Sequence, residues 1–591
     1  MPKGLLDSRS LFDQTKRELS KWLKAYFASV ECLNRKELSS YPPERDFAAG
    51  WEISVDHNDV VMVFHILLNS RFPYSKIFIA YKSEYVYLKW PHVEDNGVLC
   101  LPKAPLPNDD IEAAISQALH DAVDLIERCQ TNPQFIEDEF SNEFLSYWNR
   151  GDNRVKEVRS LLNISDSTAR SIVVWRDKFT IVGETEEQLR SWLVNTGIKE
   201  SKLSGMTSAI YVSLDKPIIP PFPTNSSAML KLLLERCEYL AELINRTPID
   251  KGVLLVLGAS SPSGDGLVAV HFTEDSMDGF RKKRVPPGAV KMNWMKYRTK
   301  LARSRVKRND SSWVHGRGLD SRHDMLHNAD VLVLGCGSVG SQVAARLAQS
   351  GVGKLTLVDP ETLEAANVGR HELGASSVDS SKATELVDQL RKRYPHALSF
   401  EGHKMSWQEF YYENPRAFEQ CDLIVACIGE LSEEGLLGEW HARSGSTTPI
   451  VYGWLDEQAT AAHAIALTSG EVFLRCLLEN DTLRTPETIW EEGALKMQAE
   501  PACGDVYQPY GAIDVSRAES LTTRLCIDVL TGKIGEPVHR VYAGTTEELS
   551  RAGGKWSEAH MLHRPAGFEG AFEYERPLAP CGVCHSCKGN E

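Results

Sequence analysis

The sequence contains no long uninterrupted apolar run and no excess of positive charge. No apolar stretch approaches the roughly 18 residues that a membrane-spanning helix requires, and the amino-terminal segment lacks the apolar core of a secretion signal. The formal net charge of −15 argues against a general nucleic-acid binder, because polyanions require a basic surface. These absences predict a cytoplasmic protein that binds neither a membrane nor a nucleic acid directly.

The 13 cysteines are scattered along the 591 residues, and only the last three lie close together. An odd, scattered set in a large chain without an export signal is typical of reduced thiols rather than of a disulfide framework. A chain of this length also exceeds a single hydrophobic core, so three or four domains are expected. The cysteines are therefore free to do chemistry in a multidomain protein.

Residues 1–150 are predicted to form an α+β domain in which several strands lie between two helices. The pattern predicts helices over 9–30 and 109–129, the second capped by Asp109 or Asp110, and strands over 51–57, 60–68, 76–81 and 84–90. Cys100 lies between the sheet and the second helix, in the stretch DNGVLCLP. Its local sequence favours a packing thiol, because free cysteine behaves as a small hydrophobe.

Residues 151–305 are predicted to form a middle α/β linker domain. Strand patterns cover 171–183, 208–214 and 251–260, and a helix is expected over 228–244. The region 281–308 is strongly basic in an acidic chain. This pattern favours a solvated linker or helix face, with a docking surface for an acidic partner as the alternative.

From residue 306 the pattern changes to alternating apolar strands and helices, which is typical of a parallel βαβ sheet. The motif G-x-G-x-x-G falls at Gly335, Gly337 and Gly340, directly after a predicted strand, where glycines let a phosphate approach a helix N-terminus. Asp359 ends the next strand, where a carboxylate can bind ribose hydroxyls. These residues predict a nucleotide site, and NAD, FAD and ATP all use versions of such a unit.

Three polar residues after Asp359 favour ATP among these nucleotides: Asn367, Arg370 and Lys382. A site that activates a carboxylate must neutralise a triphosphate and stabilise charge as pyrophosphate leaves, and the two cations suit that task. The stretch from GCGSVG to NVGRH resembles the adenylation domain of the E1 and ThiF/MoeB family. The resemblance implies a Rossmann-like domain over 306–591 that uses ATP and magnesium to adenylate the C-terminal glycine of a ubiquitin-like protein.

By the same resemblance, Asp359 binds the ribose, and Asn367, Arg370 and Lys382 contact the phosphates. Family members also carry an arginine upstream of the first strand. Arg317 is expected in that role, with Arg322 as the alternative. Where the family usually has an aspartate near the magnesium, this chain reads VACIGELSEE, and Glu430 is expected to replace that aspartate.

Cys503 lies between Pro501 and Gly504, just ahead of a predicted helix. A thiol on a loop near a helix N-terminus can have a lowered pKa and react as a thiolate. Taken alone it would be an ordinary loop cysteine, but in E1-like proteins the catalytic cysteine lies here. The resemblance therefore implies that Cys503 displaces AMP and forms a thioester.

The C-terminal stretch PCGVCHSCKGNE predicts a structural zinc site, because C-x-x-C spacing lets two thiolates reach one tetrahedral ion. The expected ligands are Cys476, Cys581, Cys584 and Cys587, with His585 as a substitute. A free or redox-active tail is the alternative.

In the first domain, PHVEDNGVLCL resembles the stretch of the ubiquitin-conjugating (E2, UBC-like) fold in which a polar element precedes the active-site cysteine. The resemblance makes Cys100 the E2 nucleophile. His92 would orient the acceptor amine or stabilise the oxyanion, although a simple turn residue is the alternative, and Asn96 is a second oxyanion candidate. An E2-like, a middle and an E1-like domain in this order resemble the E1–E2 fusion proteins of bacterial CBASS antiphage operons.

That resemblance implies an acyl relay from Cys503 to Cys100 and then to a target amine. The implied partner is a cGAS-like nucleotidyltransferase whose C-terminus is activated, and the implied assembly is a homodimer formed through the E1 half. A sulfur-carrier activating enzyme, an NAD- or FAD-dependent oxidoreductase and a non-catalytic scaffold are the competing classes. Of these, the oxidoreductase leaves both cysteine contexts and the two phosphate-site cations unexplained.

Overall fold

The structure is a computed structural model in which the chain forms two compact units. The first comprises Met1–Arg159, Asn163–Val182 and Thr207–Lys307, and the second comprises Ser160–Leu162, Gly183–Met206 and Arg308–Glu591. The described residues are 8–83, 86–101, 110–150, 157–248, 252–274, 288–468, 472–479, 482–491, 498–499, 506–507 and 510–581. Among these residues, no helix has the length and apolarity that a membrane crossing needs.

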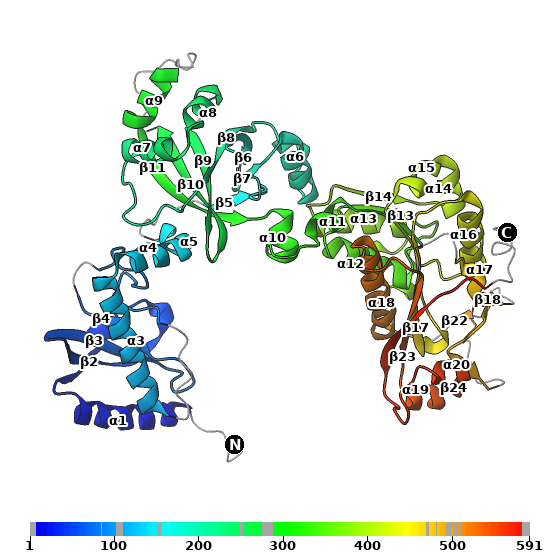
Figure 1. Ribbon diagram of the computed structural model, residues 1–591, viewed down its shortest axis with the longest axis horizontal. Coiled ribbons are helices and arrows are strands. Elements are labelled where there is room, and N and C mark those ends of the chain that lie inside the picture. The colour runs from blue at the N-terminus through cyan, green and yellow to red at the C-terminus, as the bar shows by residue number, and fades with distance from the viewer. Residues whose placement is uncertain are drawn as a thin grey trace. The chain divides into compact units, whose positions relative to one another are not determined.

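The amino-terminal part of the first unit is a four-stranded antiparallel sheet in the order β1-β2-β3-β4 (Figure 1). Its apolar face shares one core with helices α1 and α3, through side chains such as Trp51, Phe64, Leu23 and Ile115. The elements are α1 (Ser8–Tyr26), β1 (Val30–Cys32), α2 (Arg35–Leu38), β2 (Phe47–His57), β3 (Val60–Asn69), β4 (Phe78–Tyr81), α3 (Ile111–Thr131), α4 (Pro133–Asn142) and α5 (Phe144–Trp148). The predicted helix over 109–129 is confirmed, with Asp110 as its cap.

The predicted strand over 84–90 is wrong for its described residues, 86–90. Leu88 has a φ of 56°, which interrupts an extended run, and the N–H groups of Lys89 and Trp90 both donate to the carbonyl of Val86 in a turn. The aromatic residues that suggested a strand serve packing instead, because Trp90 stacks on Tyr81 of β4 with ring centroids 6.2 Å apart.

The rest of the first unit is built around a closed barrel with the strand order β10-β11-β5-β7-β6-β8-β9. The elements are β5 (Glu157–Ser160), β6 (Arg170–Arg176), β7 (Thr180–Gly183), β8 (Thr207–Leu214), α7 (Ser226–Arg236), α8 (Leu240–Arg246), β9 (Val253–Ser261), β10 (Gly264–Glu274), α9 (Gly288–Tyr297) and β11 (Thr299–Arg308). The predicted boundaries at 150 and 305 remain a prediction. The helix expected over 228–244 is divided into α7 and α8, because the chain turns at Cys237.

The described part of the basic region, 288–308, is not a linker. It forms helix α9 and the barrel strand β11, so its positive side chains project from a regular element. Arg305 and Lys307 lie 2.9 and 2.8 Å from the carboxylate of Glu157 on strand β5. Part of the basic charge is therefore balanced within the barrel.

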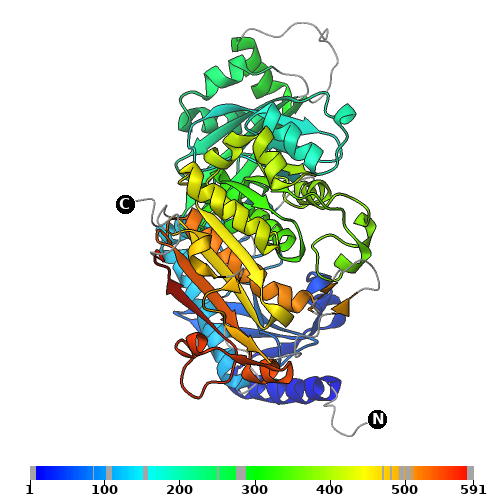
Figure 2. The ribbon, with the colours of Figure 1, turned by 90° about the vertical axis from the view of Figure 1, so that its right-hand side faces the viewer.

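The second unit contains an eight-stranded sheet in the order β14-β13-β12-β15-β16-β17-β23-β25. The first five strands are parallel, and β17, β23 and β25 continue the sheet in the antiparallel sense. Figure 2 shows these last strands side by side at one edge. Its strands are β12 (Asp330–Leu334), β13 (Lys354–Val358), β14 (Ser399–His403), β15 (Leu423–Ala426), β16 (Ile450–Leu455), β17 (Ala461–Leu467), β23 (Val538–Ala543) and β25 (Phe572–Pro577).

Helices and short strand pairs complete the second unit. The helices are α6 (Glu186–Asn195), α10 (Ser311–Gly316), α11 (His323–Asn328), α12 (Ser338–Gln349), α13 (Lys382–Arg393), α14 (Trp407–Glu413), α15 (Pro415–Gln420), α16 (Leu431–Ser444), α17 (Leu474–Leu477), α18 (Ala512–Leu530), α19 (Thr546–Arg551) and α20 (Glu558–Met561). The short strands are β18 (Leu478–Glu479), β19 (Thr482–Leu483), β20 (Thr488–Trp490), β21 (Gln498–Ala499), β22 (Val506–Tyr507) and β24 (Gly554–Trp556).

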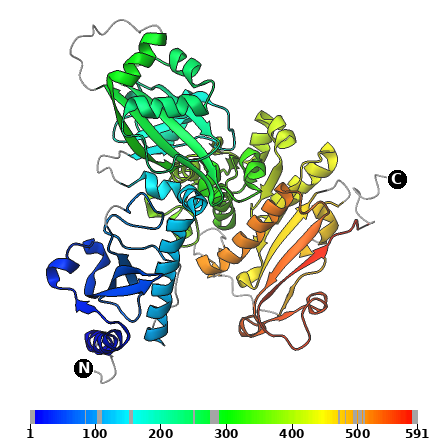
Figure 3. The same ribbon diagram turned by 60° about the vertical axis from the view of Figure 1, so that its left-hand side comes forward.

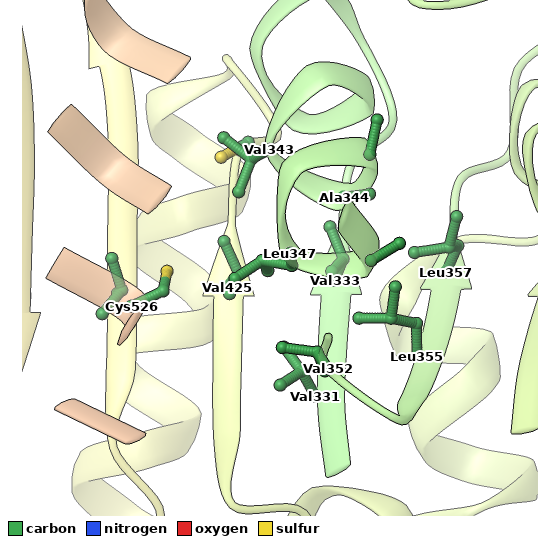
Figure 4. Close-up of a cluster of buried hydrophobic side chains, with 14 of the residues drawn as sticks. Val331, Val333, Val343, Ala344, Leu347, Val352, Leu355, Leu357, Val425 and Cys526 are labelled. Atoms are coloured by element: carbon green, nitrogen blue, oxygen red, sulfur yellow. The ribbon is translucent and has the colours of Figure 1, made fainter. Parts of the chain in front are cut away.

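The parallel strands and helices α12 and α18 bury one apolar core. Val331 and Val333 of β12 lie beneath Val343 and Leu347 of α12, and Cys526 of α18 closes the cluster (Figure 4). Figure 3 shows α18 lying across the sheet. Strands buried on both faces read as continuous apolar runs, which is why the βαβ pattern was legible in the sequence. The Rossmann-like class predicted for this part is confirmed.

Candidate functional site

Cys100 ends a tight hairpin that begins at His92. The Cys100 N–H donates to the carbonyl of His92 over 2.8 Å, so the two residues are held side by side. Gly97 supplies the turn with a φ of 83°, and the Asn96 side-chain oxygen accepts the Val98 N–H at 3.1 Å. The Asn96 oxygen thus holds the turn, and an oxyanion role for this residue stays a prediction.

The hairpin is fixed to the sheet so that the thiol faces outward. The Leu99 N–H donates to the carbonyl of Ile79 on β4 over 2.8 Å, and Leu99 is buried in the core shared by the sheet and α3. Leu101 is partly buried against the same core, whereas Cys100 between them is exposed. The apolar neighbours provide the packing that the local sequence suggested, and the cysteine itself remains accessible.

His92 is held in a left-handed backbone conformation, with a φ of 59° that non-glycine residues rarely adopt. Its N–H donates to the hydroxyl oxygen of Tyr147 over 2.6 Å. Its Nε2 lies 2.8 Å from the carboxylate of Glu139, and its Nδ1 lies 3.6 Å from that of Glu143. The ring is therefore fixed from two sides beside Cys100.

The thiol and the imidazole shift each other's pKa in opposite directions. The hydrogen bond from His92 holds the pKa of Cys100 below its ordinary value, against burial and the Glu143 charge, which raise it. Burial alone would lower the pKa of His92, but hydrogen bonds to Cys100 and Glu139 and the nearby carboxylate charges raise it above its ordinary value. Both shifts favour a thiolate beside an imidazolium.

Sequence reasoning missed Glu139, Glu143 and Tyr147. They follow one another at four-residue intervals, so they line one face of the helical stretch formed by α4 and α5. That spacing was visible in the sequence. The sequence did not show that these side chains face His92, because His92 lies far from them along the chain.

The glycines of the nucleotide loop are required by close backbone contacts. Gly335 has a φ of 87°, and a Cβ there would lie 2.6 Å from the carbonyl oxygen of Cys427. A Cβ on Gly340 would lie 2.0 Å from the carbonyl oxygen of Gly335. Gly337 caps α12, and a Cβ there would meet nothing within 4 Å. The first and third glycines thus serve packing, and the second leaves the helix N-terminus open to a phosphate.

We expect Gly340→Ala and Gly337→Ala to separate folding from nucleotide binding. Gly340→Ala should destabilise the second unit by about 1–3 kcal/mol, because the new methyl group overlaps backbone. Gly337→Ala should change stability by less than about 0.5 kcal/mol but weaken ATP binding. Thermal unfolding and calorimetric titration with ATP would measure the two effects, and equal stability losses in both variants would contradict this division of roles.

Asp359 follows β13 and is buried beside the loop. Its two carboxylate oxygens accept the N–H groups of Cys336 at 2.6 Å and Glu361 at 2.8 Å. Burial raises its pKa, while these hydrogen bonds and the charge of Lys382 oppose the rise. Lys382, at the start of α13, is itself buried and forms an ion pair with Glu361. The structure therefore brings the predicted ribose acid and a predicted phosphate cation to the same end of the sheet.

Arg370 reaches the N-terminus of α12, where its Nε donates to the Ser338 hydroxyl over 3.1 Å. Its guanidinium lies 5.1 Å from the ring centre of Tyr510, just before α18. Asn367 is half-buried nearby in the sequence, and its side-chain oxygen accepts the Glu364 N–H at 3.1 Å. A helix N-terminus with an adjacent arginine fits a phosphate group well.

His371 was also missed, although it directly follows Arg370. Its Nε2–H donates to the carbonyl of Cys336 over 2.6 Å, and its Nδ1 accepts the Leu373 N–H at 3.0 Å. Burial lowers its pKa and keeps the ring neutral, which suits one donor and one acceptor. His371 therefore fixes the backbone of the nucleotide loop at Cys336 through a hydrogen bond.

Glu430 and Arg317, which the sequence predicts to act at the nucleotide, are both exposed. Glu430 is exposed at the start of α16, and the buried acid is Glu434, whose carboxylate accepts the Ile428 N–H and whose pKa burial raises to about 7. Arg317 is exposed beyond α10, with its guanidinium over the ring of Trp313. The magnesium and arginine roles of Glu430 and Arg317 stay predictions.

Cys503 lies outside the described residues, as do Cys584, His585 and Cys587. In the sequence Cys503 falls between β21 and β22, which pair through Gln498 with Tyr507. The two described cysteines of the predicted zinc set, Cys476 and Cys581, belong to one apolar cluster, the second at its edge. Among the described residues, no group of three or more ligating side chains could hold a metal ion. Zinc stays a prediction.

Two protein families match separate parts of this chain. Residues 316–504 match the ThiF family, and residues 29–156 match the Prokaryotic E2 family B. The chain therefore joins an E1-like domain with the nucleotide loop to an E2-like domain with Cys100. That combination is an E1–E2 fusion, as the sequence resemblance implied.

Curated relatives carry names of the same kind. The chain is 26% identical over 246 residues to an "ATP-dependent ubiquitin transferase-like protein Cap2" of Pseudomonas aeruginosa. The aligned region covers 40% of this chain and 42% of the relative. The chain is also 30% identical over 105 residues to a Cap2 protein of Enterobacter hormaechei, covering 18% and 17% of the two chains. The chain thus matches less than half the length of these relatives.

Among solved structures, Escherichia coli MccB superposes over 46% of this chain and 68% of its own, at 17% identity and a TM-score of 0.32. A score this low does not establish a shared fold. The Rossmann-like fold of the second unit is established instead by its strand order and by the ThiF match.

Proposed function

We propose that the protein is an ATP-dependent ubiquitin-transferase-like enzyme that activates the C-terminus of a partner protein and joins it to a target amine. The observation that carries the proposal is the exposed thiol of Cys100, held beside His92 by a backbone hydrogen bond of 2.8 Å, in the same chain as an E1-like nucleotide loop. An activating domain supplies an acyl group, and an activated thiol beside a base can accept one.

The reaction would begin at the nucleotide loop. The partner's terminal carboxylate attacks the α-phosphorus of ATP and releases pyrophosphate, while Asp359 holds the ribose and Arg370 and Lys382 stabilise the phosphate charge. ATP supplies the adenylyl group, and Mg²⁺ would neutralise its phosphates. Cys503 then attacks the acyl carbon, forms a thioester and releases AMP.

The acyl group would next move between cysteines. The Cys100 thiolate attacks the Cys503 thioester, a new C–S bond forms, and Cys503 leaves as a thiolate. The proton that His92 took from Cys100 is released to water with this step, so His92 is neutral again. An amine then attacks the Cys100 thioester, the C–N bond forms and the C–S bond breaks. His92 takes the ammonium proton, so an amide and the free enzyme result.

The proposed partner is a cGAS-like nucleotidyltransferase, and the proposed outcome is priming of antiphage signalling. The support is the order of the E2-like and E1-like domains, which resembles that of the E1–E2 fusion proteins of CBASS operons; the Cap2 relatives support the ubiquitin-transferase-like activity. A homodimer formed through the E1 half belongs to the same proposal. The alternative is an activating enzyme of another ubiquitin-like or sulfur-carrier pathway, and it is favoured by a 36% identical stretch of 117 residues in the adenylyltransferase and sulfurtransferase uba4 of Emericella nidulans.

Partner adducts trapped in Cys100→Ala and Cys503→Ala variants would test the relay. With ATP and the partner, Cys100→Ala should leave a reducible adduct on Cys503 and abolish the amide product. Cys503→Ala should abolish both, and Cys32→Ala, which removes another exposed thiol, should change neither. Amide product from Cys100→Ala would contradict the relay, and a sulfur-carrier enzyme would form the first adduct without needing Cys100.

A further inference from the structure

The face of α4 and α5 that contacts His92 takes no direct part in the proposed acyl transfer. Glu139, Glu143 and Tyr147 all project from it towards the histidine. We propose that Glu139 is a positioning residue that turns His92 and Cys100 into a nucleophile–base–carboxylate relay. The role of this relay in acyl transfer rests on the proposed function, but its effect on the thiol does not.

The geometry of the relay follows the rule for an activated nucleophile, in which a third group orients the base. The Glu139 carboxylate lies 2.8 Å from Nε2 of His92, and the Cys100 N–H donates to the His92 carbonyl over 2.8 Å, so the thiol lies beside the oriented ring that lowers its pKa. The His92 side chain is only 16% exposed, so water competes weakly for its ring nitrogens. A carboxylate in this position fixes the ring and stabilises the imidazolium formed when the thiol proton moves to His92.

Hydrogen bonds also fix the backbone of His92. The Tyr147 hydroxyl accepts the His92 N–H at 2.6 Å, and the His92 carbonyl accepts the Cys100 N–H at 2.8 Å. The same hydroxyl donates to the Glu143 carboxylate over 3.3 Å. A strained conformation persists only where its surroundings over-determine it, and these contacts do so.

The charged groups around the pair have opposing effects on the thiol. Besides His92, the Lys76 ammonium lowers the pKa of Cys100, whereas the Glu143 carboxylate raises it. Glu139 and Glu143 both raise the pKa of His92. Glu139 contacts the histidine, so its removal should disfavour the thiolate, while removal of Glu143 relieves a direct repulsion.

Alkylation of Cys100 by iodoacetamide, followed across pH by peptide mass spectrometry on the full chain, tests the relay. In the wild-type protein the midpoint for Cys100 should lie below about 8.5, the ordinary value of a free thiol. Glu139→Gln should raise the Cys100 midpoint by about 1 pH unit and slow its alkylation near neutral pH by up to about tenfold. Glu139→Asp should restore part of the shift, because it retains the charge.

Two controls separate the relay from a general effect of mutation. Glu137→Gln removes an exposed carboxylate of the same helix, whose partner is Lys216 at 3.2 Å, and should leave the midpoint unchanged. Glu143→Gln should not raise it. A Cys100 midpoint at or above the ordinary value of a free thiol, an unchanged midpoint in Glu139→Gln, or an equal shift in Glu137→Gln would overturn the proposal.

Failure of the relay and failure of the proposed function have different outcomes. Alkylation requires neither ATP nor a partner, so a shifted midpoint in Glu139→Gln without any ATP-dependent adduct would support the relay and reject the acyl transfer. ATP-dependent adducts on Cys100 with an unshifted midpoint would support the transfer and overturn the role of Glu139.

Discussion

Replacing Glu487 by alanine is expected to destabilise the second unit by about 3–5 kcal/mol, because it leaves buried cationic and polar partners without their carboxylate. Glu487 is fully buried, and its two oxygens lie 2.9 Å from His560 Nδ1 and 3.0 Å from Arg576 Nη2. The Tyr574 hydroxyl also donates to it. Thermal and denaturant unfolding of the full chain would measure the loss, and a loss below about 1 kcal/mol, typical of exposed pairs, would contradict it.

The charge of Glu487 should make part of this stability depend on pH. Burial opposes ionisation, but the hydrogen bonds from His560 and Tyr574 and the nearby positive charges hold the pKa of Glu487 below its ordinary value. A depressed folded-state pKa stabilises the protein above the ordinary carboxyl pKa, and this stabilisation is lost as the pH falls through the folded-state pKa. The difference between wild type and Glu487→Gln should therefore shrink in acid.

The matched control is Glu547→Ala. Glu547 forms an ion pair with Arg551 at 2.6 Å, but both side chains are largely exposed on α19. An exposed pair within one helix contributes only about 0.3–0.5 kcal/mol. Comparable losses in Glu487→Ala and Glu547→Ala would show that the buried network contributes no more than a surface pair.

Replacing Arg370 by alanine is expected to reduce ATP–pyrophosphate exchange by about 10²–10³-fold, the usual effect of removing one donor that stabilises transition-state charge. Its Nε already contacts Ser338 at the N-terminus of α12, where a phosphate would bind. Exchange would be measured with a C-terminal peptide of a cGAS-like nucleotidyltransferase. Arg370→Lys should give an intermediate rate, since it retains the charge and loses the planar fork.

Arg393→Ala is the control for that measurement. Arg393 lies at the end of α13 and pairs with Glu372, so its loss removes an arginine from the same domain without touching the loop. Exchange in Arg393→Ala should remain within about twofold of wild type, as for a surface substitution. An unchanged rate in Arg370→Ala would remove Arg370 from the phosphate site.

The sequence was most informative where local spacing encodes the structure. The nucleotide loop could be predicted because Gly335, Gly337 and Gly340 belong to one strand–turn–helix unit. Cys100 and His92 could be paired because a short hairpin joins them. In each case few residues separate the partners, so the pattern and the contact coincide.

Prediction failed where partners meet only through the fold. Glu139 lies on a helix that follows α3, and its contact with His92 depends on how that helix packs. The region 86–90 has the composition of a strand, but a turn at Leu88 and the stacking of Trp90 on Tyr81 override it. The basic charge of Arg305 could not be matched to Glu157 before the barrel strands were known to be neighbours.

Tyr147 links the E2-like site to the barrel. On the same short helix, Phe144 and Trp148 are buried in the barrel core, and the Trp148 indole N–H donates to the carbonyl of Ser304 over 3.0 Å. The barrel therefore helps to hold the helix that contacts the Cys100 hairpin. A fragment that ends at residue 150 would keep every reactive group of the site but would lose the barrel contacts of Phe144 and Trp148, which hold the helix that carries Tyr147. The smallest stable E2-like fragment of this chain therefore includes the barrel.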